Sequence, residues 1–276
     1  MHAHAPAGSR TPSTAALRPR RARGHDWLLV VLAVAAMGGF SPRSVATPSV
    51  DPERRTVQAL ANAAPHAPRV AIRLAVEAMQ CAIAHGRGSA ATHLAVIDYS
   101  LPSLRPRLWV FDVATHKLLF EEFVAHGKSS GENFATTFSN DENSRASSLG
   151  LFLTDEVYAG HNGASLRLVG LEPGTNDHAL QREIVIHGAD YVDPIAGSRQ
   201  GRLGRSWGCP AVRRQVAEPL IDAIKQGNFV FAYYPDRAWL AHSPWLHCSP
   251  GQVAESTGNL HLQDPAAASN APSSGR

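Results

Sequence analysis

One cysteine lies in a turn sequence suited to nucleophilic chemistry. Cys209 follows Gly208 and precedes Pro210, and His187 ends a short β-branched run 209 − 187 = 22 positions earlier. A catalytic thiol needs an imidazole that ionises it, amide groups that receive an oxyanion, and little steric cover. These two segments supply all three, so we predict that Cys209 is a nucleophile and that His187 is its general base.

The residues around this pair suggest how the two side chains meet and what else contributes. A strand end is rigid, and the intervening loop contains several glycines, so it can turn back toward the imidazole. The backbone amides of Gly208 and Cys209, with that of Trp207, are the candidate oxyanion donors. Ser206 joins the catalytic set because its hydroxyl can orient the imidazole or bind substrate.

Two motifs resemble the murein L,D-transpeptidase catalytic domain family. They are Ile186-His187-Gly188 and Arg205-Ser206-Trp207-Gly208-Cys209-Pro210, and the likeness covers residues 94–235. The chain departs from the commoner pattern at Trp207, where a second histidine is usual, and at Ala211, where Arg or Asn is usual. It is similar to a divergent branch with a Ser-Trp-Gly-Cys-Pro-Ala core, in which Arg213 or Arg214 would replace the missing arginine.

The resemblance implies a substrate and a reaction. Cys209 would attack the carbonyl between a diamino acid and a terminal D-alanine in a peptidoglycan stem peptide, forming a thioester. An amine of a neighbouring stem would resolve it as a 3→3 cross-link, and water would make the enzyme an L,D-carboxypeptidase. Arg205, Gly188 and Arg213 are the expected substrate-binding residues, and no cofactor is implied.

Other classes of function stay open. A sortase-like transpeptidase also places histidine before cysteine, but it needs an arginine on a later strand, and Arg237 follows the last expected strand. A non-catalytic cell-wall-binding module would form no covalent adduct. A metal site is not expected, because no histidine falls in a His-Glu-x-x-His motif or in a zinc deaminase pattern.

The N-terminal residues 1–46 have the features of a signal peptide. A basic segment with four arginines between residues 18 and 23 precedes the apolar run 27–40, and Ser44-Val45-Ala46 offers a small-residue cleavage site. We therefore expect an exported protein of the periplasm or cell wall. The alternative is an uncleaved leader, which would be the route to a membrane anchor, although the apolar run is short for a bilayer span.

The charge of the chain changes when this leader is set aside. The whole chain has 26 Lys+Arg and 23 Asp+Glu, and residues 1–46 hold six Arg and one Asp, which leaves 26 − 6 = 20 and 23 − 1 = 22, a net charge of −2. A nucleic-acid partner is disfavoured, because it requires clustered positive charge. The family resemblance implies stem peptides as partners, and the sequence indicates no oligomeric state.

The three cysteines suggest one disulfide and one free thiol. Cys81 lies in an apolar helical stretch and Cys248 near the end of the expected globular part. Our hypothesis pairs these two and leaves Cys209 free, as an odd count in an oxidising compartment requires. The alternative is that all three are reduced.

The pattern of apolar residues predicts a mainly β domain with a helical N-terminal extension. Residues 47–90 form the extension, with one helix opened by Asp51-Pro52 and another opened by Pro68. The domain of residues 91–250 is expected to have mostly antiparallel strands, with one helix after the catalytic motif, from Pro219 to Gln226. The family resemblance implies that this domain is an L,D-transpeptidase-like β-sandwich. Residues 251–276, rich in Ala, Ser and Pro, are expected to be a disordered tail. The expected strands are residues 94–99, 107–112, 118–124, 149–155, 166–171, 183–187 and 228–234.

Overall fold

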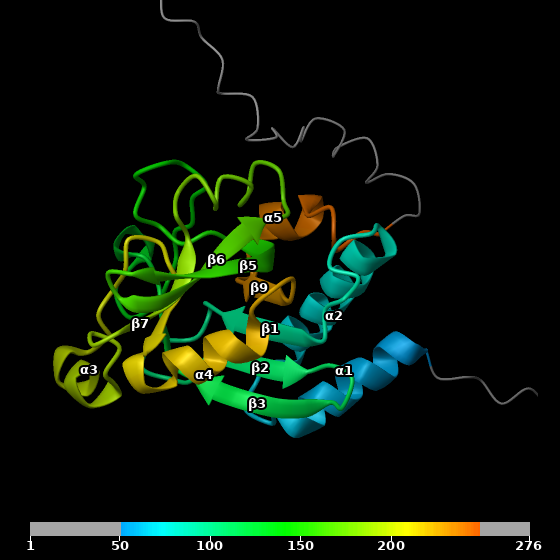
Figure 1. Ribbon diagram of the computed structural model, residues 1–276, viewed down its shortest axis with the longest axis horizontal. Helices are drawn as coiled ribbons and strands as arrows, with labels where there is room; N and C mark the ends of the chain where they lie inside the picture. The colour runs from blue at the N-terminus through cyan, green and yellow to red at the C-terminus, as the bar shows by residue number, and fades with distance from the viewer. Residues whose placement is uncertain (1–50, 249–276) are drawn as a thin grey trace, which may run out of the picture. The chain divides into compact units, whose positions relative to one another are not determined.

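A computed structural model describes residues 51–248. The predicted signal peptide and the predicted disordered tail lie outside the described residues. Two helices come first, α1 (Pro52–Ala63) and α2 (Arg69–Ala84), and Figure 1 places them together at the right. The Asp51 side chain accepts a hydrogen bond from the Glu53 amide, and Pro52 occupies the first helical position, as the sequence predicted.

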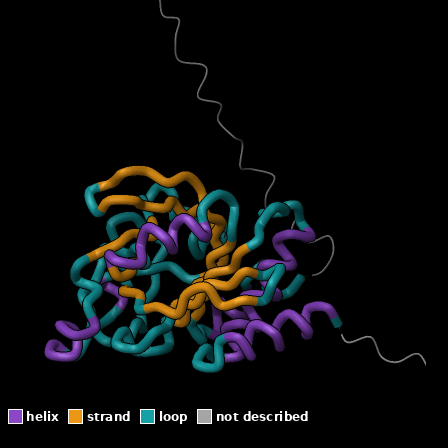
Figure 2. Tube along the Cα trace, turned by 60° about the horizontal axis from the view of Figure 1, so that its bottom comes forward, coloured by secondary structure: helices purple, strands orange, loops and turns teal. Residues whose placement is uncertain are grey.

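The remaining chain forms a mainly β domain, which confirms the predicted fold class. Its strands within residues 51–248 make one nine-stranded sheet in the order β3-β2-β1-β9-β5-β6-β7-β8-β4. Figure 2 shows these strands crossing the middle of the described part, with helices over and beside them. The strands are β1 (His93–Asp98), β2 (Leu108–Asp112), β3 (Lys117–Glu122), β4 (Val124–Ala125), β5 (Gly150–Gly160), β6 (Gly163–Gly170), β7 (Val185–Ala189), β8 (Ala211–Arg213) and β9 (Phe229–Tyr233).

Most neighbouring strands are antiparallel, as predicted from their short connections. Two pairs are parallel: β1 with β9, and β7 with β8. The second pair needs a crossover, and the connection between its strands contains α3 (Pro194–Gln200), which the sequence analysis left as loop. Asp193 caps α3 and Pro194 opens it, the same signal that opens α1. A short 3-10 helix, η1 (Lys128–Ser130), follows β4.

The helix after the catalytic motif begins earlier than predicted. α4 (Arg214–Ile224) starts five residues before Pro219, which lies inside the helix. The reason is packing: Ala217, Leu220, Ile221 and Ile224 are buried on one face, and this apolar stripe extends upstream of the proline. Proline removes only one backbone donor there, so burial outweighs its cost.

The C-terminal part of the described chain docks on the sheet. α5 (Arg237–His242), another helix that the sequence analysis missed, is capped by the Asp236 side chain. The Trp239 indole donates to the buried Glu172 carboxylate at 2.7 Å, and the Trp245 indole donates to the Leu171 carbonyl at 2.8 Å. These hydrogen bonds fasten the segment that follows β9 to the turn after β6.

A disulfide joins Cys81 of α2 to Cys248, with the two Cα atoms 5.8 Å apart. Cys209 is the free cysteine among the described residues. His85 lies beside the disulfide, so these three residues form a cluster of metal-ligating types, but the two sulfurs are bonded to each other.

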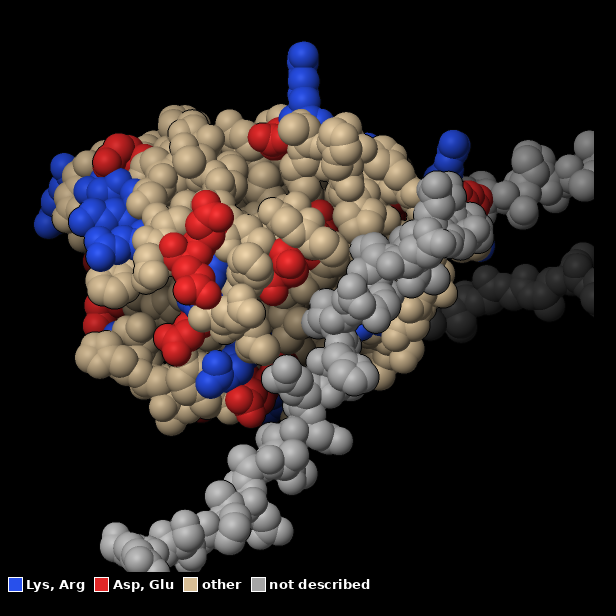
Figure 3. All heavy atoms as spheres, turned by 90° about the horizontal axis from the view of Figure 1, so that it is seen from above, with Lys and Arg blue, Asp and Glu red and all other residues tan. Residues whose placement is uncertain are grey.

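Two properties of the described surface bear on partners. No helix within residues 51–248 is long and apolar enough to cross a membrane. On the face shown in Figure 3, acidic side chains are interspersed with basic ones.

Candidate functional site

The β7 strand holds His187 rigidly in the interior of the sheet. His187 pairs with Ser165 of β6 on one side and with Ala211 of β8 on the other. Every residue of β7 is buried, and His187 is only 5% exposed. Hydrogen bonding on both edges of β7 fixes the backbone of His187, and the burial of its side chain limits the positions of the imidazole.

The neighbouring carbonyl sets the tautomer of this imidazole. His187 Nδ1 lies 3.1 Å from the Gly188 carbonyl oxygen, and a carbonyl can only accept, so Nδ1 carries the proton. Nε2 therefore has the free lone pair. Burial lowers the pKa of His187, the hydrogen bond to Gly188 opposes this shift, and the charge of Arg214 adds to it. The result is a neutral imidazole suited to accept a proton.

Cys209 sits in a turn whose shape is fixed by one hydroxyl. Ser206 Oγ donates to the Cys209 carbonyl at 2.6 Å and accepts from the Gly208 amide at 3.1 Å. The Ser206 backbone is bonded on both sides, to the His126 carbonyl and the Lys128 amide. Ser206 therefore shapes the turn that presents the thiol, instead of orienting the imidazole.

Gly208 is required at its position by conformation and by space. Its φ is 128°, a region that favours glycine, and a Cβ there would lie 2.9 Å from the Ala146 carbonyl oxygen. Its own carbonyl accepts from Ser147 Oγ at 2.9 Å. Its amide already donates to Ser206, so the prediction that Gly208 supplies an oxyanion donor is corrected here. The amides of Trp207 and Cys209 donate to no oxygen within residues 51–248 and remain available.

The sulfur is half-buried and touches the strand that carries the histidine. The Val185 amide donates to Cys209 Sγ at 3.5 Å, and the Glu183 carbonyl oxygen lies 3.6 Å from it. Burial raises the pKa of Cys209, whereas the Val185 amide and the charge of Arg182 lower it. The resting pair at neutral pH is a thiol and a neutral imidazole, and not the thiolate that the sequence analysis expected.

Cys209 and His187 line the same cavity, which has a volume of about 520 Å³. The end of the β5–β6 hairpin, with His161 and Asn162, lines it from another side. Trp207 at its mouth is 72% exposed, and the Arg145 guanidinium lies 4.8 Å from the centre of its ring. An extended peptide has space to reach the sulfur beside an exposed aromatic surface.

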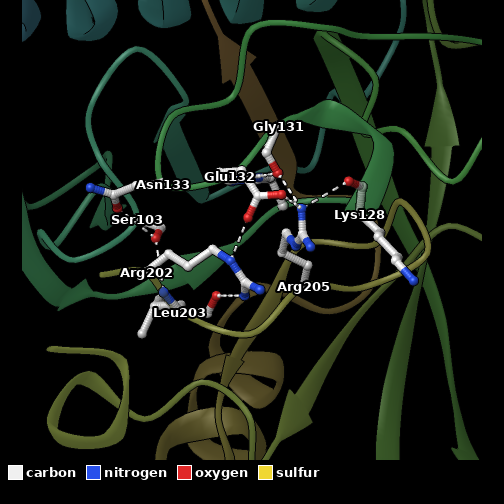
Figure 4. Close-up of polar contacts among 9 residues, drawn as sticks. Ser103, Lys128, Gly131, Glu132, Asn133, Arg202, Leu203 and Arg205 are labelled. Atoms are coloured by element: carbon white, nitrogen blue, oxygen red, sulfur yellow. Dashed lines mark hydrogen bonds and ion pairs between the residues drawn. The ribbon is translucent and has the colours of Figure 1, made fainter. Parts of the chain in front are cut away.

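Arg205 lines this cavity too, but one nitrogen of its guanidinium donates hydrogen bonds to residues 128–132. Nη1 donates to the Gly131 carbonyl and to Glu132 Oε1, both at 2.8 Å, and to the Lys128 carbonyl at 3.3 Å. Figure 4 shows Glu132 between Arg205 and Arg202, whose Nε donates to Glu132 Oε2 at 2.6 Å. This clamp ties the segment after η1 to the chain that leads into the cysteine turn.

Two predicted substrate-binding residues lie away from the cavity. A Cβ on Gly188 would lie 2.8 Å from Ala217 Cβ, so this glycine faces α4 and permits close packing of that helix. Arg213 forms a two-pronged ion pair with the buried Glu122 and lines a separate cavity of about 450 Å³. Both predictions are corrected for the same reason: Gly188 packs against α4 and Arg213 pairs with Glu122, so neither residue faces the Cys209 cavity.

Arg214, the other candidate to replace the missing arginine, donates to both carboxylate oxygens of Asp190. The sequence analysis therefore missed the cation that acts on the sulfur, Arg182, which lies before β7 and lines the Cys209 cavity. It also missed Tyr191, whose ring lies 6.5 Å from the His187 ring in an edge-on arrangement. No sequence signal marks either residue, because both reach the site only through the fold.

The L,D-transpeptidase catalytic domain model matches residues 64–233, well over half of the chain. The chain belongs to the L,D-transpeptidase catalytic domain family. The match begins upstream of residue 94, where the sequence analysis placed the start of the resemblance. No curated protein sequence matches the chain.

Solved L,D-transpeptidases are structurally similar at low identity. The Mycobacterium smegmatis L,D-transpeptidase has 14% identity and a TM-score of 0.33, with 52% of this chain and 59% of that chain covered. LdtMt1 in complex with imipenem has 15% identity and a TM-score of 0.33, with coverages of 51% and 59%. The L,D-transpeptidase of Stackebrandtia nassauensis has 13% identity and a TM-score of 0.33, with coverages of 67% and 92%. The chain thus spans less than two thirds of the length of the first two structures.

Proposed function

We propose that this L,D-transpeptidase family member is an exported enzyme that acts on peptidoglycan stem peptides through a Cys209 thioester. The observation that carries the proposal is that a half-buried thiol and a neutral imidazole with a free Nε2 line one cavity. Family membership supports the substrate class. The leader of residues 1–46 supports export to the periplasm or cell wall.

The acylation step is a proton-coupled attack. His187 Nε2 takes the thiol proton as Cys209 Sγ bonds to the carbonyl carbon before the terminal D-alanine. The amides of Trp207 and Cys209 receive the oxyanion that forms. The C–N bond then breaks, and the imidazolium gives its proton to the leaving D-alanine amine, so a thioester and a neutral imidazole remain.

The second step regenerates the thiol. An amine of a neighbouring stem attacks the thioester carbonyl, His187 accepts the proton of that amine, and the sulfur leaves and is reprotonated. The product is a 3→3 cross-link. Water in the same role releases a shortened stem, which is the L,D-carboxypeptidase reaction.

The test is covalent labelling with a carbapenem, followed by measurement of the intact mass. The wild-type protein should gain one adduct, and Cys209→Ala should gain none, because the remaining two cysteines are joined to each other. His187→Asn should slow adduct formation by a factor on the order of 10²–10⁴, the usual contribution of a general base. Absence of an adduct on the wild-type protein would favour a non-catalytic wall-binding module.

Incubation with tetrapeptide muropeptides then identifies the acceptor. Dimers that have lost D-alanine indicate a transpeptidase, and shortened monomers indicate a carboxypeptidase. Cleavage of a sorting-signal peptide without action on muropeptides would contradict the proposal and favour a sortase-like activity. N-terminal sequencing of the protein recovered from its native compartment tests export, with a new terminus near residue 47 expected.

A further inference from the structure

Arg182 is a cation in the Cys209 cavity to which no function has yet been assigned. It lies three residues before Val185, whose amide donates to the sulfur. The two arginines that follow the cysteine motif are committed to carboxylates elsewhere, Arg213 to Glu122 and Arg214 to Asp190. A positive charge at the thiol must therefore come from another part of the chain.

The Arg182 guanidinium is held by four hydrogen bonds to one segment, residues 139–148, which we call the serine strap. Nη1 donates to the Ser139 carbonyl at 2.7 Å and to Ser148 Oγ at 2.6 Å. Nη2 donates to Ser144 Oγ at 3.1 Å and to the Ala146 carbonyl at 2.6 Å. All four acceptors are uncharged, so none of these contacts neutralises the guanidinium.

The serine strap in turn contacts the cysteine turn directly. Ser147 Oγ donates to the Gly208 carbonyl at 2.9 Å and accepts from the Gly127 amide at 3.0 Å. A Cβ built on Gly208 would lie 3.4 Å from Arg182 Nη2, so the guanidinium lies against the backbone that carries Cys209. Arg182 thereby links the strap, the turn and the cavity.

The charged groups around this guanidinium include two carboxylates. Asp141, an exposed residue of the strap, is the carboxylate whose charge acts on Arg182, and Cys209 is the other negative partner when it is ionised. Arg205, the second cation in the cavity, has its Nη1 bonded to Glu132, as Figure 4 shows. Glu183, which follows Arg182 and lines the same cavity, is a carboxylate whose charge raises the pKa of Cys209 and so opposes the effect of Arg182. No ion pair joins Arg182 to a carboxylate within residues 51–248, so its charge still acts on the sulfur.

We propose that Arg182 is a positioning residue of the site: it fastens the serine strap to the cysteine turn and places beside the Cys209 sulfur a positive charge that no ion pair neutralises. This inference rests on the proposed role of Cys209 as nucleophile. During attack, the proton moves from Sγ to His187 Nε2, and negative charge develops on sulfur and then on the substrate oxygen. A fixed cation at this point stabilises both charges without rearrangement.

The experiment measures the thiol itself, without any peptidoglycan substrate. The pH dependence of alkylation by iodoacetamide, a neutral reagent, is compared for wild type, Arg182→Gln, Arg182→Lys and Arg73→Gln. Arg73 is the matched control, because it pairs with Glu77 on α2 and its loss removes the same charge elsewhere. Thermal unfolding and carbapenem acylation are measured on the same samples.

Removal of the charge should raise the pH midpoint of alkylation and slow the reaction about tenfold or more at a fixed pH below that midpoint, since an opposite charge nearby shifts a pKa by one unit or more. Arg182→Lys should keep the midpoint near that of wild type but slow acylation, because an ammonium cannot hold all four acceptors of the strap. Arg73→Gln should change neither property.

Two results would overturn the inference: an unchanged midpoint in folded Arg182→Gln, or an equal shift in Arg73→Gln. If Arg182→Gln does not fold, Arg182→Lys decides, and wild-type acylation in that variant rejects the positioning role. These failures differ from failure of the proposed function, in which the wild-type protein would gain no carbapenem adduct or Cys209→Ala would still gain one.

Discussion

At the scale of single residues, the Cys209 thiol and the His187 imidazole are both uncharged in the resting site. Burial raises the pKa of the Cys209 thiol and lowers the pKa of the His187 imidazole, so the proton stays on sulfur at neutral pH. In the reaction that we propose, the thiol is therefore a poor nucleophile until a substrate occupies the cavity, and proton transfer accompanies the attack instead of preceding it.

The pH dependence of the two reactions follows from these directions. Alkylation of the resting thiol requires thiolate, so its rate should keep rising above the ordinary range of a cysteine pKa. Acylation by a carbapenem requires neutral His187, so its acid limb should lie below the ordinary imidazole pKa. Stopped-flow or mass-spectrometric rates across the pH range test both limbs. An alkylation plateau already present at pH 7 would contradict the neutral pair and indicate a stored thiolate.

The hydroxyl of Ser206 should matter through the shape of the turn. Ser206→Ala removes the two hydrogen bonds that join Ser206 Oγ to the turn backbone, each worth about 0.5–1.5 kcal/mol. A loosened turn should slow acylation roughly tenfold to a hundredfold while the pH midpoint of alkylation moves little. Ser198→Ala, which removes a surface hydroxyl on α3, is the control and should act as wild type. A large midpoint shift in Ser206→Ala would mean that the hydroxyl acts on the sulfur itself.

At the scale of secondary-structure elements, the sequence predicted those helix starts that depend on neighbouring residues in the chain. Asp51-Pro52 predicted α1, and the same pair at Asp193-Pro194 could have predicted α3. The start of α4 was wrong because burial of Ala217 against β7 extends the helix past a proline that local signals treat as a boundary. The short connections predicted mostly antiparallel pairing, but they did not identify the two parallel pairs, β1 with β9 and β7 with β8.

The same limit explains which site residues could be predicted. His187 and Cys209 could be named because each belongs to a short motif. The expected strand ended at His187, whereas the structure places His187 in the middle of β7, because pairing with β8 extends the strand to Ala189. The sequence could not show which arginine lies near the sulfur. Only the fold pairs Arg213 with Glu122 and brings Arg182 into the Cys209 cavity. A sequence motif identifies residue types and their spacing, whereas the direction of a side chain depends on its packing against segments that are distant in the sequence.

The contact between β7 and α4 gives a prediction at this scale. Gly188→Ala places a Cβ 2.8 Å from Ala217 Cβ, which should lower the free energy of unfolding by about 1–3 kcal/mol and slow acylation, since β7 carries His187. Ala217→Gly alone should cost about 1 kcal/mol through helix propensity. The double variant should be more stable than the sum of the two losses implies, as denaturant unfolding of all four proteins measures. Strict additivity would show that the two residues do not meet.

At the scale of the whole described molecule, the C-terminal end of residues 51–248 is fastened to α2 and to the sheet, away from the candidate site. The disulfide links α2 to Cys248, and Glu172 joins the β5 backbone to α5 through the Leu151 amide and the Trp239 indole. The hydrogen bonds of the cysteine turn instead go to the segments around η1, the serine strap and β7. We therefore expect substitutions at the C-terminal fastening to change the stability of the fold without changing the reactivity of the Cys209 thiol.

Removal of the disulfide tests this separation. The double variant Cys81→Ser/Cys248→Ser opens a loop defined by a sequence separation of 167 residues, so it should lose roughly 2–5 kcal/mol of unfolding free energy. Both cysteines are replaced so that no new free thiol competes with Cys209 for reagents. Below its unfolding transition, the variant should acylate at the wild-type rate, because no partner of the cysteine turn belongs to α2 or to the segment that ends at Cys248. Slower acylation with unchanged stability would reverse the assignment and make the C-terminal segment part of the catalytic site.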